Sequence, residues 1–198
     1  LSNMDDLEYL YLYNNNISDI SALYGMEELV WLELYGNNII DISYLSSMTK
    51  LTYLHLCYNE ISSISSLSEM TDLQYLYLCY NNISDISVLA GKTTLIHLYL
   101  YNNNVTDISA LSDMENMSNL RLQSNNISDI SYLSGMSKLT ILFLDSNNIS
   151  IISALSSMND LSILRLSNNP LSTTLFSSLT TLSSLSSLTT LTLDSVGL

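Results

Sequence analysis

The chain has 198 residues, of which 19 are acidic and 5 are basic, so its formal net charge at neutral pH is −14. This charge argues against nucleic acid and against an anionic membrane surface as partners, because both would repel the protein. No apolar run approaches the roughly 20 residues that a helix needs to cross a bilayer, so we expect no membrane insertion.

A repeated pattern of 22 residues runs along the chain from Leu7, and it reads Leu-x-x-Leu-x-Leu-x-x-Asn-x-Ile/Val. Further copies begin at Leu29, Leu51, Leu73, Leu95, Met117, Leu139, Leu161 and, after a longer interval, Leu188. A constant period of this length with this consensus is typical of a leucine-rich-repeat solenoid. We therefore predict an α/β right-handed coil, with a parallel β-sheet on the concave face and 3-10 or short helical turns on the convex face.

The constant period predicts one domain over the whole chain. The repeats divide it into a partial repeat (1–6), regular repeats (7–160), a longer repeat rich in Ser, Thr and Leu (161–187) and a truncated terminal repeat (188–198). Because residues 1–6 match the tail of a repeat, we expect the chain to begin within one. In the longer repeat, Leu175, Leu179 and Leu182 are spaced i, i+4, i+7, which permits a short helix.

The fourth repeat illustrates the expected strand. Leu76 and Leu78 are two positions apart and should point inward, so Tyr75 and Tyr77 should face outward. Asn81 follows where the chain turns, and its amide can satisfy backbone groups of adjacent coils. The same position holds Asn15, Asn37, Asn59, Asn103, Asn125, Asn147 and Asn169. We expect these asparagines to form a structural ladder.

An aspartate recurs before the convex turn of five repeats, at Asp19, Asp41, Asp85, Asp107 and Asp129. A row of carboxylates could bind calcium. Asp also accepts hydrogen bonds from nearby backbone N–H groups in turns. We favour the turn role, because Ser63 and Ile151 interrupt the row.

The run Asn-Asn-Ile-Ser-Asp-Ile-Ser-Val-Leu-Ala at 81–90, with near copies at 15–24 and 125–134, resembles the 22-residue repeats of internalin-type bacterial surface proteins. The resemblance extends over residues 1 to about 170. It implies an extracellular or cell-surface location and the binding of protein partners on the concave face. The same repeat class also resembles intracellular phosphatase-regulatory subunits. A regulatory scaffold, or a structural repeat with no single ligand, therefore remains the alternative.

The outward positions of the first five predicted strands form the candidate site. This face carries 11 of the 14 tyrosines, the only tryptophan, and both histidines and cysteines. The candidate partner-binding residues are Tyr9, Tyr11, Tyr13, Trp31, Glu33, Tyr35, Tyr53, His55, Tyr75, Tyr77, His97, Tyr99 and Tyr101. Tyr and Trp commonly anchor interfaces, which favours a protein partner. A glycan is the weaker alternative, and self-association through the same patch is another.

Duplication of a single tyrosine-rich repeat could also produce such a face. The tyrosines of this face stop after Tyr101, however, although the repeats continue, and this contrast favours a role in binding.

Cys57 and Cys79 occupy the same outward position of neighbouring repeats. We expect both to be exposed, reduced and reactive, because parallel side chains on in-register strands suit a disulfide poorly. A zinc site made by these cysteines with His55 and His97 is disfavoured, because a flat sheet would spread the ligands. No nucleophile and base share a cleft that excludes water, so we predict a non-catalytic protein without metal or cofactor.

Overall fold

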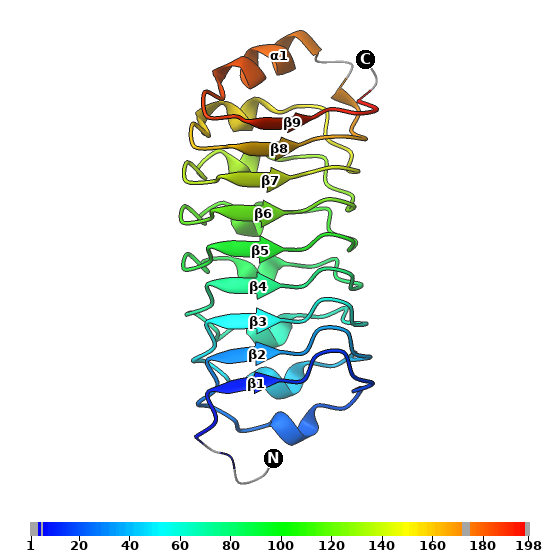
Figure 1. Ribbon diagram of the computed structural model, residues 1–198, viewed down its shortest axis with the longest axis vertical. Coiled ribbons are helices and arrows are strands. Elements are labelled where there is room, and N and C mark those ends of the chain that lie inside the picture. Colours follow the sequence, from blue (N-terminus) through cyan, green and yellow to red (C-terminus); the bar gives the residue numbers. More distant parts are fainter. Residues whose placement is uncertain (1–3, 5, 172–174, 197–198) are drawn as a thin grey trace.

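The computed structural model describes residue 4 and residues 6–171 and 175–196. Within these residues, nine strands form one parallel sheet in which each strand pairs with the next one along the sequence (Figure 1). The strands are β1 (Tyr9–Tyr11), β2 (Trp31–Glu33), β3 (Tyr53–His55), β4 (Tyr75–Tyr77), β5 (His97–Tyr99), β6 (Asn119–Arg121), β7 (Ile141–Phe143), β8 (Ile163–Arg165) and β9 (Thr190–Thr192). The predicted solenoid is confirmed. The expected partial first repeat and the last two repeats lie partly outside the described residues.

The strands pair in register, so that equivalent residues of successive repeats are neighbours. Leu32 pairs with Leu54 and Leu54 with Leu76, each one period apart, and all three side chains are fully buried. Only the last step is longer: Leu164 pairs with Leu191 across 27 residues. The alternation of a strand therefore turns one side chain of each triplet into the core and the other two outward.

The convex side is built from 3-10 turns, which Figure 1 shows behind the sheet. Among the described residues they are η1 (Ser21–Leu23), η2 (Ser43–Leu45), η3 (Ser65–Leu67), η4 (Ser87–Leu89), η5 (Ser109–Leu111), η6 (Ser131–Leu133) and η7 (Ser153–Ser157). The long repeat instead contains the α-helix α1 (Leu175–Ser184), which packs against η7 at the C-terminal end of the coil. The helix permitted by the leucine spacing is thus present.

The asparagine ladder lies where the chain leaves the sheet. The Asn81 amide donates to the carbonyl oxygens of Leu56 at 2.9 Å and Leu78 at 3.1 Å. Its Oδ1 atom accepts a hydrogen bond from the backbone N–H of Ile61 at 2.9 Å. The equivalent asparagines from Asn37 to Asn169 are also buried. The ladder therefore joins each coil to the one before it, as predicted.

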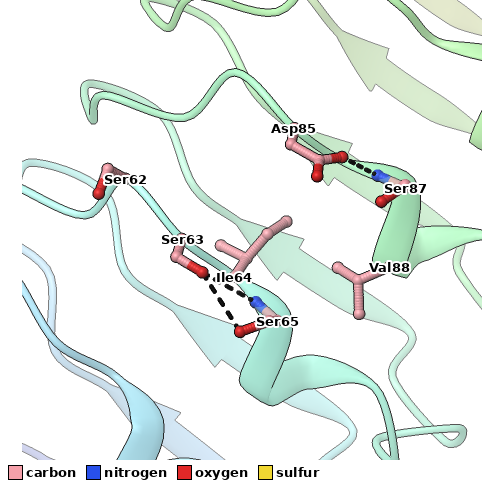
Figure 2. Close-up of a pocket in the computed structure, with 7 residues that line it drawn as sticks. All are labelled: Ser62, Ser63, Ile64, Ser65, Asp85, Ser87 and Val88. Atoms are coloured by element: carbon pink, nitrogen blue, oxygen red, sulfur yellow. Dashed lines mark hydrogen bonds between the residues drawn. The ribbon is translucent and has the colours of Figure 1, made fainter.

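The aspartates before the convex turns accept hydrogen bonds from the backbone N–H of the serine two residues later. Figure 2 shows Asp85, whose Oδ1 atom accepts from the N–H of Ser87 at 2.8 Å, beside a shallow hollow between the third and fourth repeats. The same bond, also at 2.8 Å, is made by Asp19, Asp41, Asp107 and Asp129. In the third repeat Ser63 takes this place and contacts Ser65. The predicted turn role is confirmed.

Candidate binding face

The thirteen predicted partner-binding residues, called here the aromatic patch, lie on the outer side of β1–β5 and just after these strands. Tyr9 and Tyr11, both on β1, are each 54% exposed. The members on β2–β5 are partly buried. They are less exposed because their neighbours on both sides along the sheet cover them.

Rings of equivalent positions stack along the coil in the first three repeats. Trp31 and Tyr53 lie with ring centroids 3.5 Å apart and planes 5° from parallel. Tyr13 and Tyr35 stack at 4.8 Å and 6°. In-register parallel strands place like side chains about 4.8 Å apart, which matches the spacing of stacked rings. Each stacked pair therefore covers one face of each of its two rings.

The patch continues into the fourth and fifth repeats with crossed rings. Tyr75 and His97 meet edge to face at 5.0 Å and 88°, and Tyr77 and Tyr99 are tilted by 52° at 4.6 Å. The Tyr77 hydroxyl and the His97 Nδ1 atom are 3.3 Å apart, within hydrogen-bond distance. The structure thus brings eleven of the thirteen predicted residues together in one contiguous cluster. The exceptions are Tyr9 and Tyr11 on the edge strand β1, whose rings contact no other ring of the described residues.

Glu33 is the only acidic member of the patch, and it is engaged locally. The Trp31 Nε1–H donates a hydrogen bond to the Glu33 Oε1 atom at 2.9 Å. Burial, and then the charge of Glu33, raises the pKa of Tyr53 to about 12. Burial lowers the pKa of His55 to about 4. Both side chains are therefore uncharged at neutral pH.

Beyond the fifth repeat the same face carries two arginines. The Arg121 guanidinium carbon lies 4.5 Å from the centroid of Tyr99 and 4.8 Å from that of Phe143. The Arg165 guanidinium carbon lies 4.9 Å from the centroid of the same Phe143 ring. Its Nε atom is 2.8 Å from the Asp145 Oδ2 atom. Cations and aromatic rings attract one another at these distances.

The prediction for the cysteines is wrong. Cys57 and Cys79 form a disulfide, and their exposed fractions are 1% and 2%. Their Cα atoms are 4.5 Å apart, which lies within the range that a disulfide bridges, so the in-register stacking that seemed unfavourable brings the sulfurs together. A disulfide holds no thiolate, and the zinc alternative therefore loses two of its four ligands.

Two tyrosines next to these cysteines were not among the candidates. Tyr58 and Tyr80 are 52% and 42% exposed, and their rings stack at 4.3 Å. Both have positive φ, 57° and 52°, at a position that holds Asn, Gly or Ser in the other repeats. A bulky side chain on a residue in the left-handed backbone conformation is strained, typically by about 1 kcal/mol or more. In the sequence, these two tyrosines could have been found from the unusual Cys-Tyr-Asn run, which occurs at 57–59 and again at 79–81.

Among the described residues, no three His, Cys, Asp or Glu side chains gather as metal ligands would. In the same part of the chain, no helix has both the length and the apolar character required to cross a membrane.

Comparison with protein families identifies the class. A model described as Leucine Rich repeats (2 copies) matches residues 27–69, 49–91 and 93–135. Two models described as Leucine rich repeat match residues 1–39 and 160–182. The chain belongs to the leucine-rich-repeat family.

Among solved structures, the chain is similar to internalins. Internalin C2 (inlC2) of Listeria monocytogenes aligns with a TM-score of 0.90 and 32% identity, over 98% of this chain and 83% of its own. An internalin (inlF) of the same species aligns with a TM-score of 0.73 and 31% identity, over 96% of this chain and 61% of its own. The chain therefore spans less than two thirds of that relative. The predicted resemblance to internalins is confirmed.

A more distant structure shares the fold. InlJ of Listeria monocytogenes, whose functional domain is described as including a cysteine ladder, aligns with a TM-score of 0.62 and 21% identity, over 96% of this chain and 54% of its own. No curated protein sequence matches the chain.

Proposed function

We propose that residues 1–198 act as one non-catalytic domain that binds a protein across the aromatic patch of repeats 1–5. Leucine-rich-repeat proteins are in general protein-binding modules, and their fold is typically non-enzymatic. The observation that carries the proposal is the contiguous ring cluster from Tyr13 to Tyr101 on the open side of the sheet. Tyr and Trp combine rigid apolar area with a polar tip, as interface anchors do.

The ring geometry favours a protein over a glycan. A sugar ring packs best against an exposed aromatic face. In the pairs Trp31–Tyr53 and Tyr13–Tyr35, however, the rings lie nearly parallel and close, so that they cover each other's faces. One face of each of these rings is therefore closed to a sugar, which leaves ring edges, hydroxyl groups and the outer faces of the pairs for a partner. Side chains and backbone groups of a protein suit such a surface.

The disulfide supports an extracellular or cell-surface location, in line with the internalin relatives. Disulfides persist in oxidising compartments and are rare in the cytosol. This argument favours a bacterial surface or secreted protein over the alternative of an intracellular regulatory scaffold.

The test uses peptides selected on the folded chain from a displayed random library. Trp31→Ala and Tyr77→Ala should each weaken the binding of a selected peptide by about 2 kcal/mol, roughly 30-fold. Tyr24→Ala is the matched control, because Tyr24 lies on the convex side and is 71% exposed. If the control weakens binding and the two patch variants do not, the partner lies elsewhere. Sedimentation that shows a dimer until Trp31 is replaced would assign the patch to self-association.

A further inference from the structure

The charges of the concave face differ from those of the whole chain. The face consists here of the outward positions of repeats 1–8, namely the first and third residues of β1–β8 and the second residue after each strand. Of the 19 acidic and 5 basic residues, these positions hold Glu33, Asp145, Arg121 and Arg165. The face is therefore neutral on a chain with a net charge of −14, and both arginines of the protein lie on it.

Three of these four charges are already engaged. Arg165 pairs with Asp145, with 2.8 Å between Nε and Oδ2. Glu33 accepts the indole N–H of Trp31 and lies on β2, four strands from Arg121, which corresponds to about 19 Å. Among the described residues, Arg121 has no ion pair with a carboxylate. It is the one cation of the face whose charge is not balanced nearby.

Arg121 is also held in place. Its guanidinium lies between the rings of Tyr99 and Phe143, and its Nε–H donates to the Asn119 Oδ1 atom at 3.3 Å. The Asn119 amide in turn donates to the Tyr99 hydroxyl at 3.0 Å. The side chain remains partly exposed, and none of its terminal amino groups donates to a described residue. A fixed guanidinium with free donors is suited to bind a carboxylate through two parallel hydrogen bonds.

We infer that Arg121 is the anion-binding subsite of this face, and that the protein partner places an Asp or Glu carboxylate there while its apolar side chains lie on the aromatic patch. This inference rests on the proposed function and names the chemistry of the partner. The negative charge of the rest of the chain does not prevent the contact, because salt screens charges beyond about 8 Å at physiological ionic strength. His97 supplies no competing cation, since burial and the charge of Arg121 lower its pKa.

The experiment compares peptides selected from the random library on the wild-type chain and on Arg121→Gln. Peptides selected on the wild type should carry Asp or Glu at one fixed position. Arg121→Gln, or replacement of that acid by its amide, should each weaken binding at least tenfold, and the two changes together should cost little more than either alone. Arg121→Lys should retain part of the affinity, because lysine keeps the positive charge but cannot donate the two parallel hydrogen bonds of a guanidinium. Lys138→Gln removes an exposed cation that bonds Asn116 rather than a carboxylate, and it should have no effect.

The outcomes separate the two proposals. If peptides depend on Trp31 and Tyr77, yet show no acidic position and lose less than twofold with Arg121→Gln, the subsite is wrong and the proposed function stands. If no selected peptide depends on Trp31 or Tyr77, the proposed function is wrong and the subsite falls with it. Circular dichroism of Arg121→Gln and Arg121→Lys checks that both variants are folded, and the acid-to-amide exchange in the peptide tests the subsite on the unmodified protein.

Discussion

Asn81 and Ile61 connect the fourth repeat to the third through a hydrogen bond of 2.9 Å, in which the Ile61 N–H donates to the Asn81 Oδ1 atom. The neighbouring Asn82 has an exposed side chain, although it carries the same amide. These adjacent residues therefore provide a matched pair that separates the structural role of the ladder from the chemistry of asparagine.

Asn81→Ala should destabilise the protein much more than Asn82→Ala. The first change leaves the Ile61 N–H without its buried acceptor, at about 1–3 kcal/mol for such a loss. It also removes one of the two asparagine amides that donate to each of the carbonyls of Leu56 and Leu78. The second should change the free energy of unfolding by less than about 0.5 kcal/mol. Urea unfolding of both variants measures the difference. Equal shifts would contradict the ladder.

Replacing Cys57 and Cys79 together by alanine should lower the stability by about 3 kcal/mol, because the disulfide closes a loop of 22 residues in the unfolded chain. Thermal unfolding of the double variant measures this loss. In the wild type, a thiol reagent should detect no cysteine even in denaturant until a reductant is added. Two reactive thiols in denatured, unreduced protein would show that the pair is not bonded.

Acid should destabilise the protein through His55. Burial lowers its folded pKa to about 4, below the usual value near 6.5, so the unfolded chain binds the proton first. The contribution of His55 is fully present above pH 6.5 and is lost as the pH falls from 6.5 through 4. Allowing for partial solvent access, the loss is about 1–2 kcal/mol.

His55→Phe, which keeps an aromatic ring between Tyr35 and Tyr77, removes this titration. The free energies of unfolding of the wild type and the variant, measured from pH 7 to 4.5, should diverge in favour of the variant as the pH falls. Parallel curves would show that His55 is not desolvated.

Lys92→Met should stabilise the protein by about 1 kcal/mol. Lys92 is 4% exposed and its Nζ atom donates to the carbonyls of Ser68 and Met70, whereas the equivalent residue in six other repeats is methionine. Burial lowers its pKa, so wild-type stability should rise as the pH increases toward 10.5. Calorimetry at pH 7 and pH 9.5 measures both effects, with Lys138→Met as the exposed control. A variant less stable than the wild type would show that the two hydrogen bonds outweigh the cost of burial.

The sequence alone determined the coil. The period of 22 residues repeats the inward leucines, such as Leu76 and Leu78, and the buried asparagine, such as Asn81, in each copy. Only a stack of similar coils buries all of these leucines and gives all of these asparagines their hydrogen-bond partners. For the same reason the outward position of Tyr75 and Tyr77 followed from alternation along the strand.

The tertiary structure decided what the outward side chains do. The sequence places Cys57 and Cys79 at the same position of neighbouring repeats. Whether their sulfurs meet depends on small differences in the spacing of the two strands, whose Cα atoms are 4.5 Å apart here, and a sequence period does not specify such differences. Likewise, the sequence does not show that Arg121 lies between Tyr99 and Phe143 while Arg165 is neutralised by Asp145. Long side chains have several rotamers, and their choice is settled by the three-dimensional neighbours along the sheet rather than by residues near them in the chain.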